Sequence, residues 1–327
     1  MPPPVVKTNM ARQKRLDIPG GIYHVLTRGI DRMTIFRDNA DYQHFLDRLE
    51  AVLRKTQCRC YAWVLMHNHL HLLLRTMRRA LCETMSGLLT GYALYFNRKY
   101  HRKGYLFQNR YQSILCQEEP YFIELVRYMH LNPVRAGLVS TLDDLDGFPW
   151  SGHAVLMGRR IARWQDTDEV LGRFGRTRRQ SVRAYRSFLE DGWKTAGPGA
   201  RSDGLRRIHR TWISMPGKPR GPWRDGECVL GDDDFVKRVM ARAEEEMIRR
   251  EQRKRSGWTL DRLVEHVCTM VGVPPSELIK KGRANKISIA KGLIAYWGKT
   301  ELGIPGAEIA RYLQISRKGF SLMYPAE

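Results

Sequence analysis

The chain has 327 residues, with 56 lysines and arginines against 34 aspartates and glutamates, a formal net charge of +22 and a pI near 10.0. A surplus of this size predicts a polyanionic partner, because bound phosphates release condensed counterions and so supply sequence-independent affinity. We find no apolar run of bilayer length and no secretory or lipidation signal, so the composition favours nucleic acid over a membrane.

The first half of the chain reads as alternating strands and helices. Side-chain alternation with a period of two predicts the strands, and apolar residues at helical spacing predict the helices. This order and these connection lengths predict an α+β domain, in which helices cover one face of a small antiparallel sheet. The predicted strands cover residues 22–27, 61–75 and 106–112, and the predicted helices cover residues 38–55, 82–100 and 120–132.

Two histidines stand out in the second predicted strand. His69 and His71 are two residues apart, so their imidazoles project from the same face of a strand while Leu70 and Leu72 pack behind them. Neutral imidazole is a frequent ligand of divalent metals, and a strand fixes both rings. Taken alone, such a pair is more often two ordinary histidines at the end of a strand.

The helix predicted over residues 120–132 carries a second polar feature. Glu124, Tyr128 and Asn132 recur every four residues and therefore stack one turn above another on a single face. A tyrosine and an amide on one helical face can approach the two histidines of the sheet together. For Tyr128 alone, an aromatic residue at the edge of a helix is the simpler interpretation.

Four sequence blocks, taken together, resemble the signature blocks of the REP-associated tyrosine transposases, which are single-tyrosine relatives of the IS200-like transposases of the HUH class. The blocks follow one another in order and spacing within residues 11–155. His67 departs from the pattern, because the family commonly has proline there. The blocks read GIYHVLTRG at 21–29, MHNHLHLL at 66–73, FQNRY at 107–111 and RYMHLNPVRAGL at 127–138.

The resemblance implies an HUH domain of the ferredoxin/RRM-like type over residues 11–155, and it implies roles for four residues. His69 and His71 are the implied paired metal ligands, Asn132 is the third ligand, and Tyr128 is the nucleophile that forms a 5′-phosphotyrosine. Two imidazoles and an amide oxygen leave a metal its full charge and several open positions, which suits Mg²⁺ or Mn²⁺ acting on phosphate. A structural zinc site is the alternative, although no thiolate falls at a suitable spacing.

Three arginines within the blocks are candidates for nucleic-acid binding. Arg28 follows the first predicted strand, Arg110 lies within the third, and Arg135 follows the third predicted helix, and all three could hold DNA phosphates. In so basic a chain, a single arginine is more often an ordinary surface residue.

The second half of the chain has a different character. Residues 156–256 read as a basic helical region followed by a linker rich in Gly, Pro and Arg. Residues 257–327 are compact and helical, and they resemble the C-terminal helix-turn-helix domain of the replication initiator DnaA. The docking geometry of such units predicts that Ser316, Arg317 and Lys318 begin the recognition helix and face duplex DNA.

The sequence therefore predicts a metal-dependent single-strand DNA endonuclease and strand transferase that recognises hairpin-forming palindromic (REP) repeats. The expected partners are single-stranded DNA and DNA hairpins, with duplex DNA bound by the C-terminal domain, and the protein is expected to be a monomer or homodimer. The six cysteines form no Cys-x-x-Cys pair, so we expect a reducing, cytoplasmic, nucleoid-associated location. Two alternatives remain, a non-catalytic sequence-specific DNA-binding regulator and a protein that binds or cleaves RNA.

Overall fold

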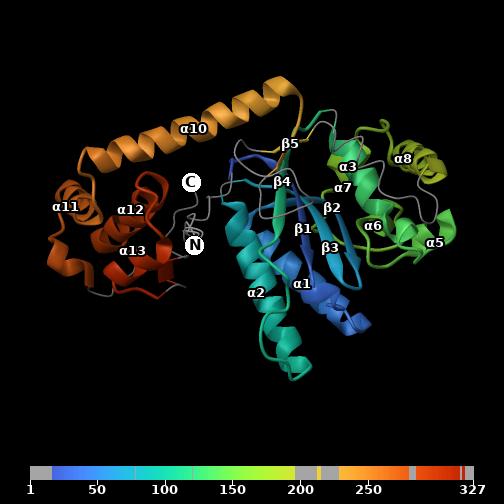
Figure 1. The fold of residues 1–327 in the computed structure, drawn as a ribbon, viewed down its shortest axis with the longest axis horizontal. Coiled ribbons are helices and arrows are strands. Elements are labelled where there is room, and N and C mark those ends of the chain that lie inside the picture. The colour runs from blue at the N-terminus through green and yellow to red at the C-terminus, as the bar shows by residue number, and fades with distance from the viewer. Residues whose placement is uncertain are drawn as a thin grey trace, which may run out of the picture. The chain divides into compact units, whose positions relative to one another are not determined.

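The computed structural model describes residues 17–77, 79–119, 121–195, 212–214, 228–279, 285–316 and 319–320. The chain divides into two compact units, Met1–Val236 and Lys237–Glu327. Figure 1 shows the mixed sheet of the first unit and the helices of the second.

The first unit is built on a sheet that has six strands among the described residues, in the order β2-β3-β1-β4-β6-β5. Its first four strands alternate with helices α1 and α2 in the chain order βαββαβ, and their pairings β2–β3, β1–β3 and β1–β4 are all antiparallel. This arrangement confirms the predicted α+β class. The four strands are β1 (Ile22–Arg28), β2 (Arg59–Met66), β3 (His69–Arg75) and β4 (Gln112–Cys116).

The two helices between these strands form where the sequence predicts them. Helix α1 (Asn39–Thr56) begins after Asp38, whose carboxylate accepts a hydrogen bond from the backbone N–H of Asp41 at 2.9 Å. Such a cap satisfies one of the unpaired donors at a helix start. Helix α2 (Leu81–Lys99) lies beside α1 on one side of the sheet (Figure 1).

The opposite face of the sheet is covered by a second helical layer. Phe122, Leu125 and Met129 of α3 (Tyr121–His130) pack in one core with residues of β1, β2, β3 and β4. The expectation that helices cover one face is therefore wrong, because the strands are apolar on both faces and each face needs a cover. The layer continues through α4 (Asn132–Arg135), α5 (Leu142–Gly147), α6 (Gly152–Leu156), α7 (Thr167–Leu171) and α8 (Arg178–Thr195). A short helix, η1 (Ile30–Arg32), lies on the loop after β1.

Two predicted strands differ from the observed ones. The predicted strand over 61–75 is a hairpin, because the chain turns at His67-Asn68 and β3 pairs back onto β2. The strand predicted over 106–112 is wrong, since β4 begins only at Gln112. Residues 106–111 run beside the end of β1 with one isolated bridge, Phe107 to Gly29, because the chain after β1 turns away into η1.

The segment expected to be a linker contributes two short strands to the sheet. Strand β6 (Cys228–Leu230) pairs parallel to β4, and β5 (Trp212–Ser214) pairs antiparallel to β6. The intervening part of the predicted linker lies outside the described residues. Residues after 155 also contribute to the first core, through Val170 and Leu171 of α7 and Tyr185 of α8.

The second unit is helical throughout its described residues. Its core is formed mainly by Leu263, Val267, Ile294 and Ile309, from three different helices. No helix in the described part of the chain is long and apolar enough to cross a membrane. The helices are α10 (Asp233–Arg255), which begins in the first unit, α11 (Leu260–Val271), η2 (Pro275–Ile279), α12 (Lys286–Thr300) and α13 (Gly306–Tyr312).

Candidate active site

Three histidines meet on the face of the sheet that α3 covers. The register pairs Leu26 of β1 with His71 of β3, so His24, His69 and His71 all project from this face. His24 and His71 are almost completely buried, at 3% and 5% exposure. The ring centroids of His69 and His71 lie 5.3 Å apart, and those of His24 and His71 lie 5.1 Å apart.

Hydrogen bonds fix the orientation of these rings. The Nδ1 of His69 lies 2.7 Å from the Oδ1 of Asn68, and an amide oxygen only accepts, so Nδ1 donates and Nε2 keeps its lone pair. The Nδ1 of His71 lies 2.9 Å from the Nε2 of His24. When the Nδ1 of His71 donates to His24, the Nε2 of His71 is also free to bind a ligand.

The surroundings keep these imidazoles neutral. Burial lowers the pKa of His69 to about 4, and the nearby Arg28 adds to the effect. Burial likewise lowers the pKa of His71 well below its usual range, with further contributions from the neighbouring histidines. A neutral imidazole offers a lone pair, which is the form that binds a metal.

Helix α3 brings Tyr128 to the same place. Its apolar stripe, which includes Val126 and Met129, is buried against the sheet, and this packing directs the Tyr128 ring toward the histidines. The ring centroid of Tyr128 lies 6.1 Å from that of His71 and 6.2 Å from that of His24, both edge to face. Burial raises the pKa of the Tyr128 phenol, while the positive charges of Arg135 and Arg28 oppose this shift.

Asn132 lies one turn beyond Tyr128, where α3 has ended and α4 begins. Its Nδ2 donates to the carbonyl oxygens of Tyr128 at 3.0 Å and Met129 at 3.2 Å. Because both bonds use the amide nitrogen, the Oδ1 of Asn132 takes no part in them. Pro133 follows directly, and a proline tolerates this position in the first turn of a helix because its missing N–H needs no partner there.

Two of the three predicted DNA-binding arginines lie at this site. The guanidinium of Arg135 lies 4.7 Å from the centroid of the Tyr128 ring, and its Nη1 donates to the Tyr128 carbonyl at 2.8 Å. Arg28 ends β1 directly opposite His69 in the register. Arg110 is exposed in the loop before β4.

The structure describes only one of the three residues predicted to face duplex DNA. Ser316 is exposed, and its Oγ accepts a hydrogen bond from the backbone N–H of Gly319 at 3.0 Å, as a residue capping a helix does. Arg317 and Lys318 lie outside the described residues. His67, in the turn between β2 and β3, is exposed.

Two features that hold the site in place are not among the predicted site residues. The first is His24, whose only local signal is its alternation with Ile22 and Leu26 on the same strand face. The other feature is a buried polar network, in which the Tyr185 hydroxyl lies 2.6 Å from the Nδ1 of His130 on α3 and 3.3 Å from the Nδ1 of His153. This network ties the helix of Tyr128 to α6 and α8.

The residues that could hold a metal here are the predicted ligands His69, His71 and Asn132. No group of three or more His, Cys, Asp or Glu side chains suited to a metal occurs among the described residues. His69 and His71 carry neutral nitrogen donors, and Asn132, one turn beyond Tyr128, carries an amide oxygen. This set fits a divalent ion that takes its other ligands from water and phosphate.

Comparisons with known proteins address the same region. Residues 18–132 match the model of a family described as "Transposase IS200 like". Among solved structures, the chain is similar to one described as "Structure of the REP associates tyrosine transposase bound to a REP hairpin", at 20% identity and a TM-score of 0.38, covering 46% of this chain and 87% of that chain. A search of curated proteins gives no match. The region that matches the family model contains all three histidines and Tyr128 and ends at Asn132.

Proposed function

Residues 18–132 match the model of the IS200-like transposase family, and we propose that the chain cuts and rejoins single-stranded DNA through Tyr128. The substrate is a phosphodiester of a DNA strand, and the product is a covalent protein–DNA intermediate. The observation that carries the proposal is the approach of the Tyr128 ring, on one helix, to His71 on a strand remote in sequence, with 6.1 Å between the centroids.

The reaction is a transesterification. The Tyr128 phenol loses its proton, and its oxygen forms a bond to phosphorus while the bond from phosphorus to the 3′ oxygen breaks. The 3′ oxygen gains a proton and leaves as a hydroxyl, and the phosphate remains on Tyr128 as a 5′-phosphotyrosine. Because the phosphoester bond is kept, a 3′-hydroxyl can reverse the step and rejoin the strand without ATP.

Arg135 and Arg28 have roles in this step that follow from their positions. Both carry a positive charge beside Tyr128, and both oppose the rise in the pKa of its phenol that burial causes. Their guanidinium groups are suited to bind the non-bridging oxygens of the phosphate. His24 orients His71 through the 2.9 Å hydrogen bond between their rings.

We include a divalent cation, Mg²⁺ or Mn²⁺, in the proposal. His69, His71 and Asn132 would hold it. When bound, such an ion relieves the negative charge that builds up on the phosphate oxygens.

The preferred DNA is proposed to be a hairpin formed by a palindromic repeat, with a single-stranded flank that carries the cleavage site. The +22 net charge of the chain supports a nucleic-acid substrate. In this proposal the C-terminal unit binds duplex DNA through the segment of Ser316, Arg317 and Lys318.

The test is a search for the covalent intermediate. The protein is incubated with a hairpin labelled at its 3′ end, in the presence of Mg²⁺ or Mn²⁺, and resolved on a denaturing gel. We expect a labelled protein band that disappears in Tyr128→Phe. The matched control is Tyr105→Phe, which removes the same hydroxyl from a residue that is 84% exposed.

Retention of the labelled band in Tyr128→Phe would overturn the assignment of the nucleophile. Hairpin binding without any labelled band, with either metal, would instead favour the DNA-binding regulator. Equal binding and cleavage of a ribose hairpin would favour an RNA substrate.

A further inference from the structure

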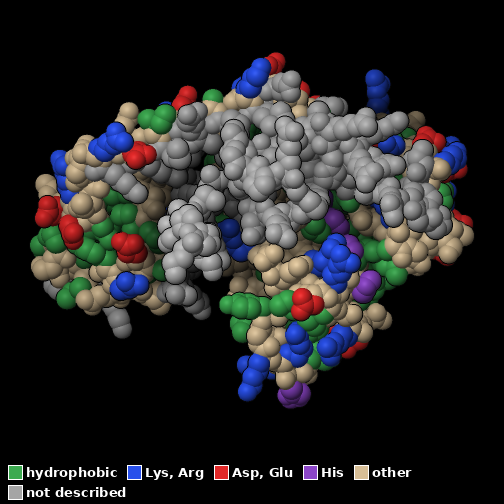
Figure 2. Space-filling view, in the orientation of Figure 1, with side chains coloured by type: hydrophobic (Ala, Val, Ile, Leu, Met, Phe, Trp, Pro, Cys, Tyr) green, Lys and Arg blue, Asp and Glu red, His purple; other side chains and the backbone are tan. Residues whose placement is uncertain are grey.

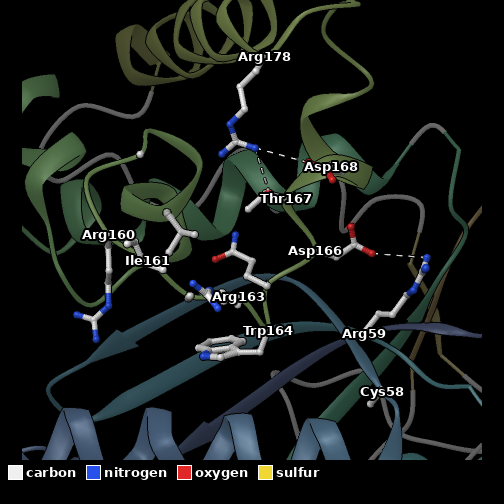
Figure 3. Close-up of a pocket in the computed structure, with 14 residues that line it drawn as sticks. Cys58, Arg59, Arg160, Ile161, Arg163, Trp164, Asp166, Thr167, Asp168 and Arg178 are labelled. Atoms are coloured by element: carbon white, nitrogen blue, oxygen red, sulfur yellow. Dashed lines mark hydrogen bonds and ion pairs between the residues drawn. The ribbon is translucent and has the colours of Figure 1, made fainter.

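A pocket of about 620 Å³ opens beside the outer edge of β2, away from Tyr128. Figure 3 shows the side chains that line it, among them Arg178 from the start of α8 and Arg59 from β2. The loop of residues 158–166, called the arginine loop below, supplies most of the remaining wall. A second hollow, of about 220 Å³, lies between the same loop and α1.

The arginine loop presents positive charge without neutralising partners. Arg159 and Arg163 are exposed, and no hydrogen bond or ion pair of their side chains occurs among the described residues. Arg160 is held by the carbonyl of Pro149 at 2.9 Å and by the Trp150 ring, whose centroid is 5.2 Å from its guanidinium. The loop is therefore a fixed ridge that carries free cationic side chains on its surface.

The acids of the pocket do not remove this charge. Asp166 lies 3.5 Å from Arg59, and Asp168 lies 3.6 Å from Arg178. Both distances are long, and Asp168 is 96% exposed, so these ion pairs are weak and exchange readily for a phosphate. The four arginines that line the pocket outnumber its two aspartates.

The arginine loop also presents an apolar and an aromatic side chain. Ile161 is 85% exposed between Arg160 and Arg163, and Trp164 rests against Trp63 with 5.5 Å between the ring centroids. Arginines interleaved with an aromatic ring suit a nucleic acid, because phosphates meet the cations and a base can stack on the ring.

A line of aromatic side chains connects the pocket with the active-site end of β2. Trp150, under Arg160, stacks on Tyr42 at 4.5 Å, and Tyr42 stacks on Phe36 at 4.5 Å. The backbone N–H of Phe36 donates to the carbonyl of His67, in the turn that precedes His69. Strand β2, which runs beside this line, spans about 23 Å at roughly 3.3 Å per residue.

We propose that the outer edge of β2, from Trp150 to the arginine loop, is a second DNA-binding surface that holds the single strand flanking the cleavage site. The inference rests on the proposed function for the identity of the strand, but the binding surface is tested separately from catalysis. Arg159 and Arg163 bind phosphates, and Trp164 stacks on a base.

The test measures the affinity for a hairpin with a long single-stranded flank as a function of salt, in chelator so that no cleavage occurs. Each phosphate contact on a single strand contributes about 0.7 to the slope of log K against log salt. We therefore expect the double variant Arg159→Gln/Arg163→Gln to reduce the magnitude of the slope by about 1.4. At physiological salt its affinity should fall roughly tenfold.

The matched control is Lys55→Gln/Arg183→Gln, which also removes two exposed positive charges from the first unit. It should leave the slope unchanged. Trp164→Leu should weaken binding by about fivefold or more without changing the slope, since stacking releases no counterions. Shortening the flank should remove the difference between the wild type and the arginine variant.

The proposal would be overturned if the arginine variant had the same slope of log K against log salt as the wild type. It would also be overturned if the control variant reduced this slope as much as the arginine variant does. A change in sedimentation of the arginine variant with an unchanged slope would show a protein interface instead. The labelled adduct reports on the proposed function independently. The wild type could form no adduct while the arginine variant still shows a smaller slope of log K against log salt. That result would support the DNA-binding surface and reject the proposed cleavage activity.

Discussion

The two regions on either side of β2 differ in how their polar groups are held. At the active-site end, His24, His71 and Tyr128 are enclosed between the sheet and α3, and each touches the next. Along the outer edge, Arg159 and Arg163 stand exposed without partners among the described residues. In the proposed function, the chemistry therefore depends on a few groups in mutual contact, whereas the affinity for DNA depends on many independent charges. Figure 2 shows Lys and Arg side chains at several separate places on one face.

The largest expected effect is at the histidine pair. His71→Ala removes a proposed metal ligand from the buried site, and we expect loss of the covalent adduct. Hairpin affinity should stay within a few fold, because binding is spread over many basic contacts. Adduct yield and affinity are measured on the same preparation, with His101→Ala, at an exposed position, as the control. Loss of binding together with cleavage would contradict the separation of the two regions.

His24 should show a smaller effect of the same kind. His24→Ala removes the partner of the His71 Nδ1, and outer hydrogen-bond partners of metal ligands typically account for about 10-fold to 100-fold in activity or metal affinity. We expect the rate of adduct formation to fall by that range, with recovery at higher Mn²⁺ concentration. A rate equal to that of the wild type would mean that His71 is positioned by packing alone.

The hydrogen-bond network of Tyr185, His130 and His153 should affect the stability of the protein more than its cleavage activity. Tyr185→Phe deletes the hydroxyl that lies 2.6 Å from His130 and 3.3 Å from His153. Leaving buried polar partners unsatisfied costs about 1–3 kcal/mol, so the free energy of unfolding in urea should fall by that amount. A variant that loses cleavage without losing stability would instead place Tyr185 in the chemistry.

The same network predicts a pH dependence of stability. Burial lowers the pKa of His153 despite the nearby Asp146 carboxylate, so the folded protein keeps this imidazole neutral where the unfolded chain protonates it, below about 6.5. Protons then favour the unfolded state, and the free energy of unfolding should decrease as the pH falls from 7 toward about 5. His153→Gln should reduce this dependence, measured by urea denaturation at several pH values. An unchanged pH dependence would assign it to other groups.

The smallest effect is expected at Arg110, which is exposed in the loop before β4. Arg110→Gln should reduce the magnitude of the salt slope by about 0.7 and leave the adduct yield at saturating DNA unchanged. A fall in the adduct yield at saturating DNA would indicate that Arg110 takes part in the cleavage step and not only in DNA binding.

Local patterns in the sequence were sufficient for the elements that depend on local interactions. Asp38 caps α1 at the start of the helix predicted over residues 38–55, and the alternation around His69 and His71 places both rings on one strand face. Helix α3 also forms where its apolar stripe predicts it, and therefore carries Tyr128 toward the sheet.

Features that depend on distant pairing could not be predicted in this way. The contact of His24 with His71 follows from the register between β1 and β3, which no local pattern fixes. Strand β6 joins β4 across more than a hundred residues, so a short apolar run inside a segment rich in glycine, proline and arginine gave no sign of it. The arginine loop likewise becomes a surface only because residues near 165 return to the edge of β2.

The return of residues near 165 to the edge of β2 also affects how copies of the protein can associate. The backbone of Leu65 donates to the carbonyl of Trp150, and Asp166 donates to that of Cys60, so part of the outermost strand's hydrogen-bonding capacity is already used within the chain. An exposed edge strand is a common route to uncontrolled polymerisation, and natural proteins protect it with a covering loop or with charged side chains. Trp150 and the arginine loop occupy both ends of this edge, and the loop adds positive charge, so a second copy of the protein has little strand edge left to pair with here.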